Sequence, residues 1–261
     1  MDLELGGKKV FVSGSTRGIG YAVAEMLAHE GASVVINGRT EPRVADAVER
    51  LRETVPGAPV SGMAADFADP VQVESLLDGL GEVDVLVNNV GVFDVAGFGE
   101  LQDADWLRYF EINVMSGVRL ARALVGPMLK KGWGRIIFVG TEPAVDVPGD
   151  MIHYGATKAA GLALGNGLAK LTRGTGVTVN TVLGGPTYSD GVADAIEQIA
   201  SAHPMTIDEL RSSLVRPSSL VQRFLEPKEI ANLVAYLASP LSAATNGAAV
   251  RADGGVLPTL L

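Results

Sequence analysis

The sequence contains no cysteine among its 261 residues, which excludes disulfide bonds, thiolate nucleophiles and cysteine metal sites. Basic residues are in deficit, and the formal net charge of −9 argues against general nucleic-acid binding, which requires a basic face. Residues 1–9 lack the apolar core of a signal peptide, and no uninterrupted apolar run reaches membrane-spanning length. These absences favour a cytoplasmic protein that binds neither nucleic acid nor membranes.

Glycine, in contrast, is abundant at 32 residues, and 47% of the chain is hydrophobic against 20% charged. This composition is typical of a globular protein with a large core and many tight turns. The length is ordinary for one α/β domain, and the sequence shows neither a linker nor a repeat. We therefore expect a single domain over residues 1–261.

Short apolar runs alternate with amphipathic helical patterns along the whole chain. The expected strands cover residues 9–13, 33–37, 60–64, 83–87, 135–139, 177–182 and 248–251. The helical patterns cover residues 21–30, 41–55, 71–80, 104–131, a long segment that starts near Tyr154, and 227–237. This alternation predicts an α/β, Rossmann-like fold: one doubly wound parallel sheet of about seven strands with helices on both faces.

A glycine-rich turn joins the first expected strand to the first helix, as in a nucleotide-binding βαβ unit. Its spacing is G-x-x-x-G-x-G, not the more familiar G-x-G-x-x-G. Such glycines permit a tight turn, close approach to a pyrophosphate and close helix packing, while the helix N-terminus offers amide donors. The turn consists of Gly14, Ser15, Thr16, Arg17, Gly18, Ile19 and Gly20. We expect it to bind a dinucleotide.

The end of the second expected strand indicates which dinucleotide is bound. An acidic residue there would bind the ribose 2′-hydroxyl of NADH, whereas an arginine would accommodate the 2′-phosphate of NADPH. Arg39 occupies this position, no carboxylate occurs before Glu41, and Arg17 lies in the nearby turn. Two cations favour NADP(H) over NAD(H), although solvated arginines would leave NAD(H) open.

Tyr154 and Lys158 are the strongest candidates for proton-transfer chemistry. Four residues apart in a helical pattern, their side chains leave the same helix face. An ammonium held near a phenol favours the phenolate and lowers the tyrosine pKa, as general acid–base catalysis requires. The same spacing also fits a tyrosine and a lysine that are only solvated. The surrounding sequence must therefore distinguish a catalytic pair from two solvated side chains.

Other polar residues follow the expected strands at the sheet edge where ligands of open α/β sheets bind. Asp66 ends the third strand, Asn89 follows the fourth and Thr141 follows the fifth. Asn113 interrupts a helical pattern, where an asparagine either packs and caps or has a functional role. The segment at about 188–227 has no expected strand, and we expect it to form a lid over the substrate.

The order of these motifs resembles the short-chain dehydrogenase/reductase family over nearly the whole chain. Asn88-Asn89-Val90-Gly91 resembles the family's Asn-Asn-Ala-Gly signature, and Gly184 replaces the first proline of its segment beside the nicotinamide. The resemblance implies catalytic roles for Tyr154, Lys158, Thr141 and Asn113. It implies cofactor contacts at the glycine turn and at Arg39, Asp66, Phe67, Asn89, Gly91, Tyr154, Lys158, Gly185, Pro186, Thr187 and Ser189.

The chain departs from this family at the catalytic serine, because Thr141 stands thirteen residues before Tyr154. Threonine has the same donor and acceptor capacity but a stiffer side chain. We expect it to serve; the alternative is a weakened enzyme or a nucleotide-binding relic. We expect Glu142 to point into solvent and His153 to pack rather than relay protons. His29 and His203 are not accompanied by other metal-ligating residues in the sequence, so no metal is expected.

These observations lead to the hypothesis of an NADP(H)-dependent reductase of 3-oxoacyl or other ketones, reversible as an alcohol dehydrogenase. One alternative is an NAD-dependent sugar or alcohol dehydrogenase. Another is a sensor or scaffold that binds a dinucleotide without turnover. The resemblance also implies a homo-oligomer, either a tetramer or a dimer.

Overall fold

Each of the seven apolar runs forms a strand of one parallel sheet in the computed structural model, which describes residues 2–202 and 206–260. The strands lie in the order β3-β2-β1-β4-β5-β6-β7, which confirms the predicted fold class. Their bounds are β1 Lys9–Val12, β2 Ser33–Gly38, β3 Val60–Ala64, β4 Val85–Asn88, β5 Trp133–Thr141, β6 Gly176–Gly184 and β7 Ala249–Ala252. The order reverses between β1 and β4, so the ligand crevice of such a sheet lies at the carboxyl ends of these strands.

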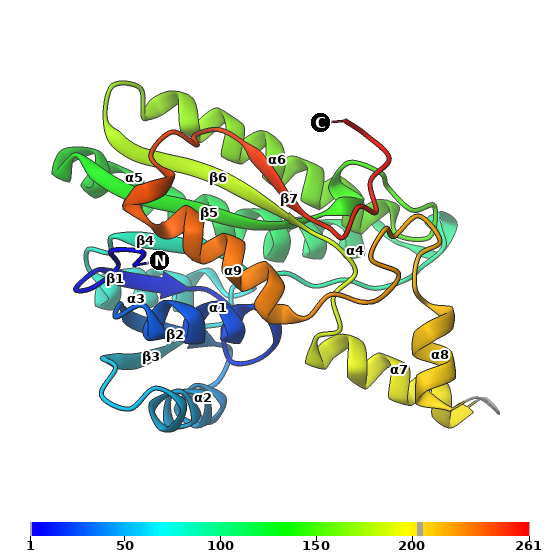
Figure 1. Ribbon diagram of the computed structural model, residues 1–261. Coiled ribbons are helices and arrows are strands. Elements are labelled where there is room, and N and C mark those ends of the chain that lie inside the picture. The colour runs from blue at the N-terminus through cyan, green and yellow to red at the C-terminus, as the bar shows by residue number, and fades with distance from the viewer. Residues whose placement is uncertain (1, 203–205, 261) are drawn as a thin grey trace.

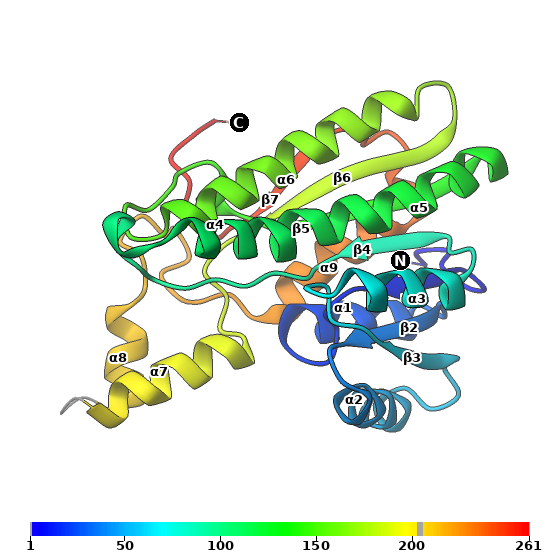
Figure 2. The same ribbon diagram turned by 180° about the vertical axis from the view of Figure 1, so that it is seen from behind.

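Helices cover both faces of the sheet, as Figures 1 and 2 show. The α-helices are α1 Gly18–His29, α2 Glu41–Thr54, α3 Pro70–Leu80, α4 Asp103–Phe110, α5 Ser116–Lys131, α6 Ile152–Leu171, α7 Asp190–Ala202, α8 Ile207–Ser213 and α9 Pro227–Ala238. Helices α1, α2 and α9 contribute to one buried cluster, and α3, α5 and α6 pack against the other. These helices therefore leave the two ends of the strands uncovered.

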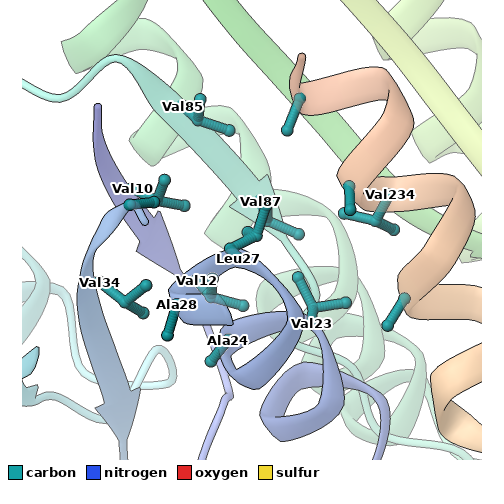
Figure 3. Close-up of a cluster of buried hydrophobic side chains, with 14 of the residues drawn as sticks. Val10, Val12, Val23, Ala24, Leu27, Ala28, Val34, Val85, Val87 and Val234 are labelled. Atoms are coloured by element: carbon teal, nitrogen blue, oxygen red, sulfur yellow. The ribbon is translucent and has the colours of Figure 1, made fainter. Parts of the chain in front are cut away.

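The alternation of side chains along each strand builds these two cores. Val10 and Val12 of β1 belong to the buried cluster that includes Leu27 of α1 and Val234 of α9 (Figure 3). Phe11, between the two valines, belongs to the opposite cluster. Successive strand residues point to opposite faces, and burying one such side chain contributes about 1.5–3 kcal/mol. The continuous apolar runs in the sequence reflect this burial on both faces.

The two longest strands end later than the sequence predicted, and this affects the functional edge. Strands β5 and β6 pair over nine residues each, from Trp133 with Gly176 to Thr141 with Gly184. Thr141 is thus the last residue of a central strand, where the ladder restrains its backbone. The hydroxyl group is consequently held at the carboxyl edge by the sheet itself.

The helical pattern predicted for residues 104–131 corresponds to a continuous helical stretch, but this stretch is not one regular α-helix. The chain forms α4, then a π-helical turn at Glu111–Met115, then α5. Asn113 lies in this wide turn, and its amide pairs with the backbone of Val92 through bonds of 2.7 and 3.0 Å. Its Nδ2 also donates to Thr157 Oγ1 at 3.0 Å. These tertiary bonds explain why the helix widens there, and π-turns occur often at functional sites.

The segment after β6 forms α7 and α8, which lie beyond the carboxyl ends of the strands (Figures 1 and 2). Its return to α9 is held by an isolated bridge between Thr187 and Leu225. Residues 203–205, which include His203 and Pro204, lie outside the described residues. The described helices place the segment next to the edge where the candidate residues gather.

Candidate active site

The sequence-predicted residues of β4, β5, α6 and the loop after β6 line one cavity of about 300 Å³ at the carboxyl edge of the sheet. Its lining includes Ile19, Asn89, Gly91, Thr141, Tyr154, Lys158, Gly185, Pro186, Thr187 and Ser189. Asn113 lies behind this wall, because a Cβ at Gly91 would be 3.5 Å from Asn113 Oδ1 and 3.1 Å from Lys158 Nζ. The absence of a side chain at Gly91 therefore gives the lysine its room.

Tyr154 and Lys158 occupy the first two turns of α6, which begins at Ile152. Lys158 Nζ lies 5.7 Å from the centre of the Tyr154 ring and donates to the carbonyl oxygen of Val139 at 3.3 Å. Burial lowers the pKa of Lys158 to about 8. The ammonium is thus held in the cavity by a strand carbonyl.

The prediction that Lys158 lowers the pKa of Tyr154 is wrong. Burial raises the pKa of Tyr154, the charge of Glu142 raises it further, and the hydrogen bond with Thr141 lowers it. Desolvation disfavours the phenolate, and a carboxylate nearby disfavours it again. Tyr154 is therefore a neutral phenol that holds its proton at neutral pH, as a general acid must.

The expectation that Glu142 points into solvent is also wrong. Glu142 is 3% exposed; its Oε2 accepts from Thr141 Oγ1 at 2.7 Å, and its Oε1 lies 3.1 Å from Arg216 Nη2. Burial raises the pKa of Glu142, while Thr141 and Arg216 act against that shift. A short 3₁₀ turn over Glu142–Ala144, with Pro143 in it, directly follows β5. Sequence reasoning missed this contact, and the only signal was an acid adjoining the expected catalytic hydroxyl.

His153 is buried among aromatic side chains, in keeping with the expected packing role. Its ring meets Tyr109 at 4.4 Å and Trp106 at 6.3 Å between centroids, each nearly edge to face. Such pairs stabilise a core beyond their buried area. The histidine therefore packs the start of α6 against α4.

The glycine turn has the close packing that its sequence implies. Gly14 and Gly18 adopt left-handed φ angles of 62° and 60°, which favour glycine. Gly14 N–H donates to Asn37 Oδ1 at 2.9 Å, and Asn89 Nδ2 donates to the Gly14 carbonyl at 2.9 Å. A Cβ at Gly20 would overlap that carbonyl oxygen and lie 2.5 Å from Asn89 Nδ2. Asn37 of β2 and Asn89, which follows β4, thus hold the turn from the two sides of β1.

The first backbone amide of α1 binds an anionic oxygen of this chain. Gly18 N–H donates to Asp190 Oδ2 at 2.6 Å, and Arg17 pairs with Asp194 at 2.8 Å. Both acids belong to α7. A helix N-terminus favours negative charge, so the amide and the arginine fit the phosphates of a dinucleotide.

The remaining predicted cofactor residues lie along the same edge. Arg39 is exposed immediately after β2, and Asp66 follows β3 with its carboxylate accepting from Ala68 N–H at 3.0 Å. Phe67, in contrast, is 3% exposed and its ring belongs to the core. Only the backbone of Phe67 is therefore placed for a ligand contact.

Within residues 2–202 and 206–260, no three His, Asp or Glu side chains are grouped so that they could hold a metal ion. His203, named in the metal expectation, lies outside those ranges. Every helix within these ranges is too short or too polar to span a lipid bilayer.

Lys158→Met is expected to stabilise the fold at pH 7 by about 2 kcal/mol. A lysine pKa of about 8 in the folded state, below its unfolded value, means that folding opposes the buried charge, at ~1.4 kcal/mol per unit before solvent screening. Below pH 8 this cost is fully present, and it disappears as the pH rises toward 10.5 because folded Lys158 loses its proton first. Chemical denaturation of both proteins from pH 6 to 10 measures the effect.

The matched control is Lys170→Met, which changes an exposed lysine of the same helix and should alter stability by less than about 0.5 kcal/mol. A Lys158→Met protein no more stable than the wild type at pH 7, or an advantage that grows toward pH 10, would contradict the burial argument.

The amino-acid sequence of this chain is similar to those of known proteins. A family model described as short chain dehydrogenase matches residues 8–200. The chain is 43% identical to the uncharacterized oxidoreductase YvaG of Bacillus subtilis over 98% of both chains. It is 32% identical to 3-oxoacyl-[acyl-carrier-protein] reductase FabG of Escherichia coli, over 96% of this chain and 97% of that one.

A solved structure with the same fold holds a cofactor and a substrate. L-sorbose reductase from Gluconobacter frateurii, in complex with NADPH and L-sorbose, superimposes with a TM-score of 0.93 over 100% of both chains, at 32% identity. The similarity thus includes the carboxyl edge as well as the sheet.

Proposed function

We propose, from the premise that the chain belongs to the short-chain dehydrogenase family, that it is an NADP(H)-dependent reductase of ketones that also oxidises secondary alcohols. The observation that carries this proposal is the cavity in which Thr141, Tyr154 and Lys158 meet at the carboxyl edge. A neutral phenol, a second hydroxyl and a buried ammonium there are suited to protonate a carbonyl oxygen.

The cofactor-binding residues follow from the same edge. The Gly18 amide and Arg17 would hold phosphates, as their contacts with Asp190 and Asp194 support. Asp66 would hold the adenine end, and Gly91, Lys158, Gly185 to Thr187 and Ser189 would hold the nicotinamide end. When bound, NADPH supplies the hydride.

Protein groups supply the proton and orient the substrate. Tyr154 would donate its proton to the carbonyl oxygen, and Thr141 would donate to the same oxygen once its hydroxyl proton turns away from Glu142 Oε2. The buried Lys158 would stabilise the phenolate that remains. We infer from the resemblance that Thr141 takes the place of the family's serine. Its stiffer side chain donates to Glu142 Oε2 at 2.7 Å, which fixes its position.

A small second cavity supports the proposed role of Asn113 in returning protons. Its volume of about 30 Å³ suits a single water, and its lining includes Asn88, Asn113, Thr157 and Lys158. The buried amide of Asn88 makes no side-chain hydrogen bond within the described part of the chain. A water there would link the region of Lys158 with the π-turn.

Arg39→Ala is expected to raise the KM for NADPH by about tenfold or more and to leave the KM for NADH nearly unchanged. An arginine that binds a 2′-phosphate makes charge-assisted hydrogen bonds worth about 1.5–3 kcal/mol, whereas NADH offers only a hydroxyl. Initial rates with both cofactors, in the wild type and the variant, measure this difference. Arg122→Ala, an exposed arginine of α5, is the control.

A wild-type preference for NADH that Arg39→Ala does not alter would favour the alternative NAD-dependent sugar or alcohol dehydrogenase. A sugar substrate is supported by the similarity of this chain to the structure of L-sorbose reductase.

A panel of ketones and secondary alcohols, assayed with both cofactors, tests the proposed activity directly. Tight NADPH binding without turnover of any member would instead indicate a dinucleotide-binding sensor. The proposal includes a lid role for residues 188–227, whose Leu214, Arg216 and Phe224 line the cavity, and a homo-oligomeric protein in the cytoplasm.

A further inference from the structure

Glu142 places an ionisable group in the wall of the cavity that contains Tyr154. The residue is only 3% exposed, yet it lines the cavity together with Thr141 and Arg216. Removing a carboxylate from water is costly unless charged and hydrogen-bonding partners compensate it. Stability alone does not account for such a group, since a buried ion pair contributes little compared with apolar packing.

The partners of Glu142 leave it able to accept another hydrogen bond. An ionised carboxylate has about four acceptor positions. Thr141 Oγ1 donates to Oε2 at 2.7 Å, Arg216 lies 3.1 Å from Oε1, and the residue's own backbone N–H contributes a third interaction. At least one acceptor position therefore remains for a group in the cavity.

The carboxylate lies one hydrogen bond away from the reacting position. Under the proposed function, the substrate carbonyl oxygen binds at the hydroxyl groups of Tyr154 and Thr141, and Thr141 directly contacts Glu142. A hydroxyl on the carbon next to the carbonyl lies about one hydrogen-bond length from the carbonyl oxygen. Such a hydroxyl is within reach of Glu142.

The charges around this position select against an anionic substrate group. Glu142 would repel a carboxylate, and Arg216 is already paired with Glu142. Asp253, the next nearby acid, is paired with Arg251 at 2.9 Å. Phe93, Met151, Leu214 and Phe224 form the apolar part of the remaining wall. Its polar part includes Lys158, Thr187 and Ser189, which are assigned above to the nicotinamide end. A neutral, hydroxylated substrate of modest size fits these surroundings.

We propose that Glu142 is a hydrogen-bond-accepting subsite that selects neutral substrates with a hydroxyl on the carbon beside the reacting carbonyl. The substrate class is α-hydroxyketones in reduction and vicinal diols in oxidation, and this assignment rests on the proposed function. The carbonyl carbon gains a hydride and its oxygen gains the Tyr154 proton, while NADPH is oxidised to NADP⁺. The neighbouring hydroxyl donates to Glu142 and is chemically unchanged.

Two ketones of similar size and carbonyl reactivity test the subsite. Hydroxyacetone carries the required donor, and methoxyacetone replaces it with an ether. With NADPH, the wild type should show a kcat/KM for hydroxyacetone about 10- to 100-fold higher, since a hydrogen bond to a charged group is worth about 1.5–3 kcal/mol. The ratio of the two kcat/KM values cancels general effects on the cofactor or fold.

Glu142→Gln keeps the size of the side chain but removes its charge, so the ratio should fall by about tenfold. Glu142→Leu, which has no acceptor, should bring the ratio close to one. Glu74→Gln, an exposed glutamate of α3, should leave the ratio unchanged. A merely structural role for Glu142 would lower both kcat/KM values equally and leave their ratio as in the wild type.

An equal kcat/KM for the two ketones in the wild type would overturn the subsite, even where a variant fails to bind NADPH. An unchanged ratio in a Glu142→Gln protein that binds NADPH normally would do the same. A wild type that reduces no carbonyl compound at all would instead overturn the proposed function, so the two failures are distinguishable.

Discussion

Tyr154→Phe is expected to lower kcat for NADPH-dependent ketone reduction by about 10²–10⁴-fold while NADPH binding is retained. The phenol is the neutral acid of the cavity, because burial and the charge of Glu142 raise its pKa. Removing the hydroxyl removes the proton donor, and general acid catalysis contributes a factor of this size. Single-turnover reduction with saturating NADPH, with binding followed by nucleotide fluorescence, measures the two effects separately.

The loss should appear in kcat and kcat/KM together, because the proton is transferred only in the transition state. Tyr236→Phe provides the control, since this tyrosine lies on α9 and is 39% exposed. Ketone reduction by Tyr154→Phe at a near wild-type rate would show that another group donates the proton.

Much of the fold could be predicted because its signals are local. Apolar runs identify strands buried on both faces, and the glycines between the first strand and α1 identify a nucleotide-binding turn. The topology then brings Thr141 and Tyr154 to one edge, as the sequence implied. Residues 13 positions apart meet there because β5 ends and α6 begins at the carboxyl edge.

The site details that escaped prediction depend on contacts between distant parts of the chain. The π-turn around Asn113 is supported by Val92, 21 residues earlier, and by Thr157, 44 residues later. Glu142 is turned inward beside Arg216, which comes from the segment after α8. No periodicity in a single sequence records such pairings.

The pKa of Tyr154 illustrates the same limit. The four-residue spacing to Lys158 is a property of the helix, and it correctly places the two side chains together. The direction of the shift, however, is decided by burial and by Glu142, whose side-chain orientation the sequence does not reveal. The spacing of residues thus predicts which side chains lie together on one helix. Tertiary packing determines which charged form of each side chain is favoured.

Gly20→Ala is expected to weaken NADPH binding by about 100-fold or more and to destabilise the fold by about 1–3 kcal/mol. A Cβ at this position overlaps the Gly14 carbonyl oxygen and lies 2.5 Å from Asn89 Nδ2 and 3.0 Å from Ser15 Cα. Two of these three atoms are backbone, so the turn itself must shift rather than a flexible side chain. A displacement near 1 Å at a positioning element can cost about two orders of magnitude.

Nucleotide titration and thermal unfolding measure these two losses, and Gly126→Ala is the matched control. Gly126 is also a helical glycine, exposed on α5, and a Cβ there meets no atom within 4 Å. Alanine should therefore stabilise that helix by about 0.5–1 kcal/mol and leave NADPH affinity unchanged. A loss of stability in Gly20→Ala and a gain in Gly126→Ala would show that glycine is required at residue 20 for packing of the turn against α1. If Gly20→Ala bound NADPH as tightly as the wild type, the turn would not be the phosphate site.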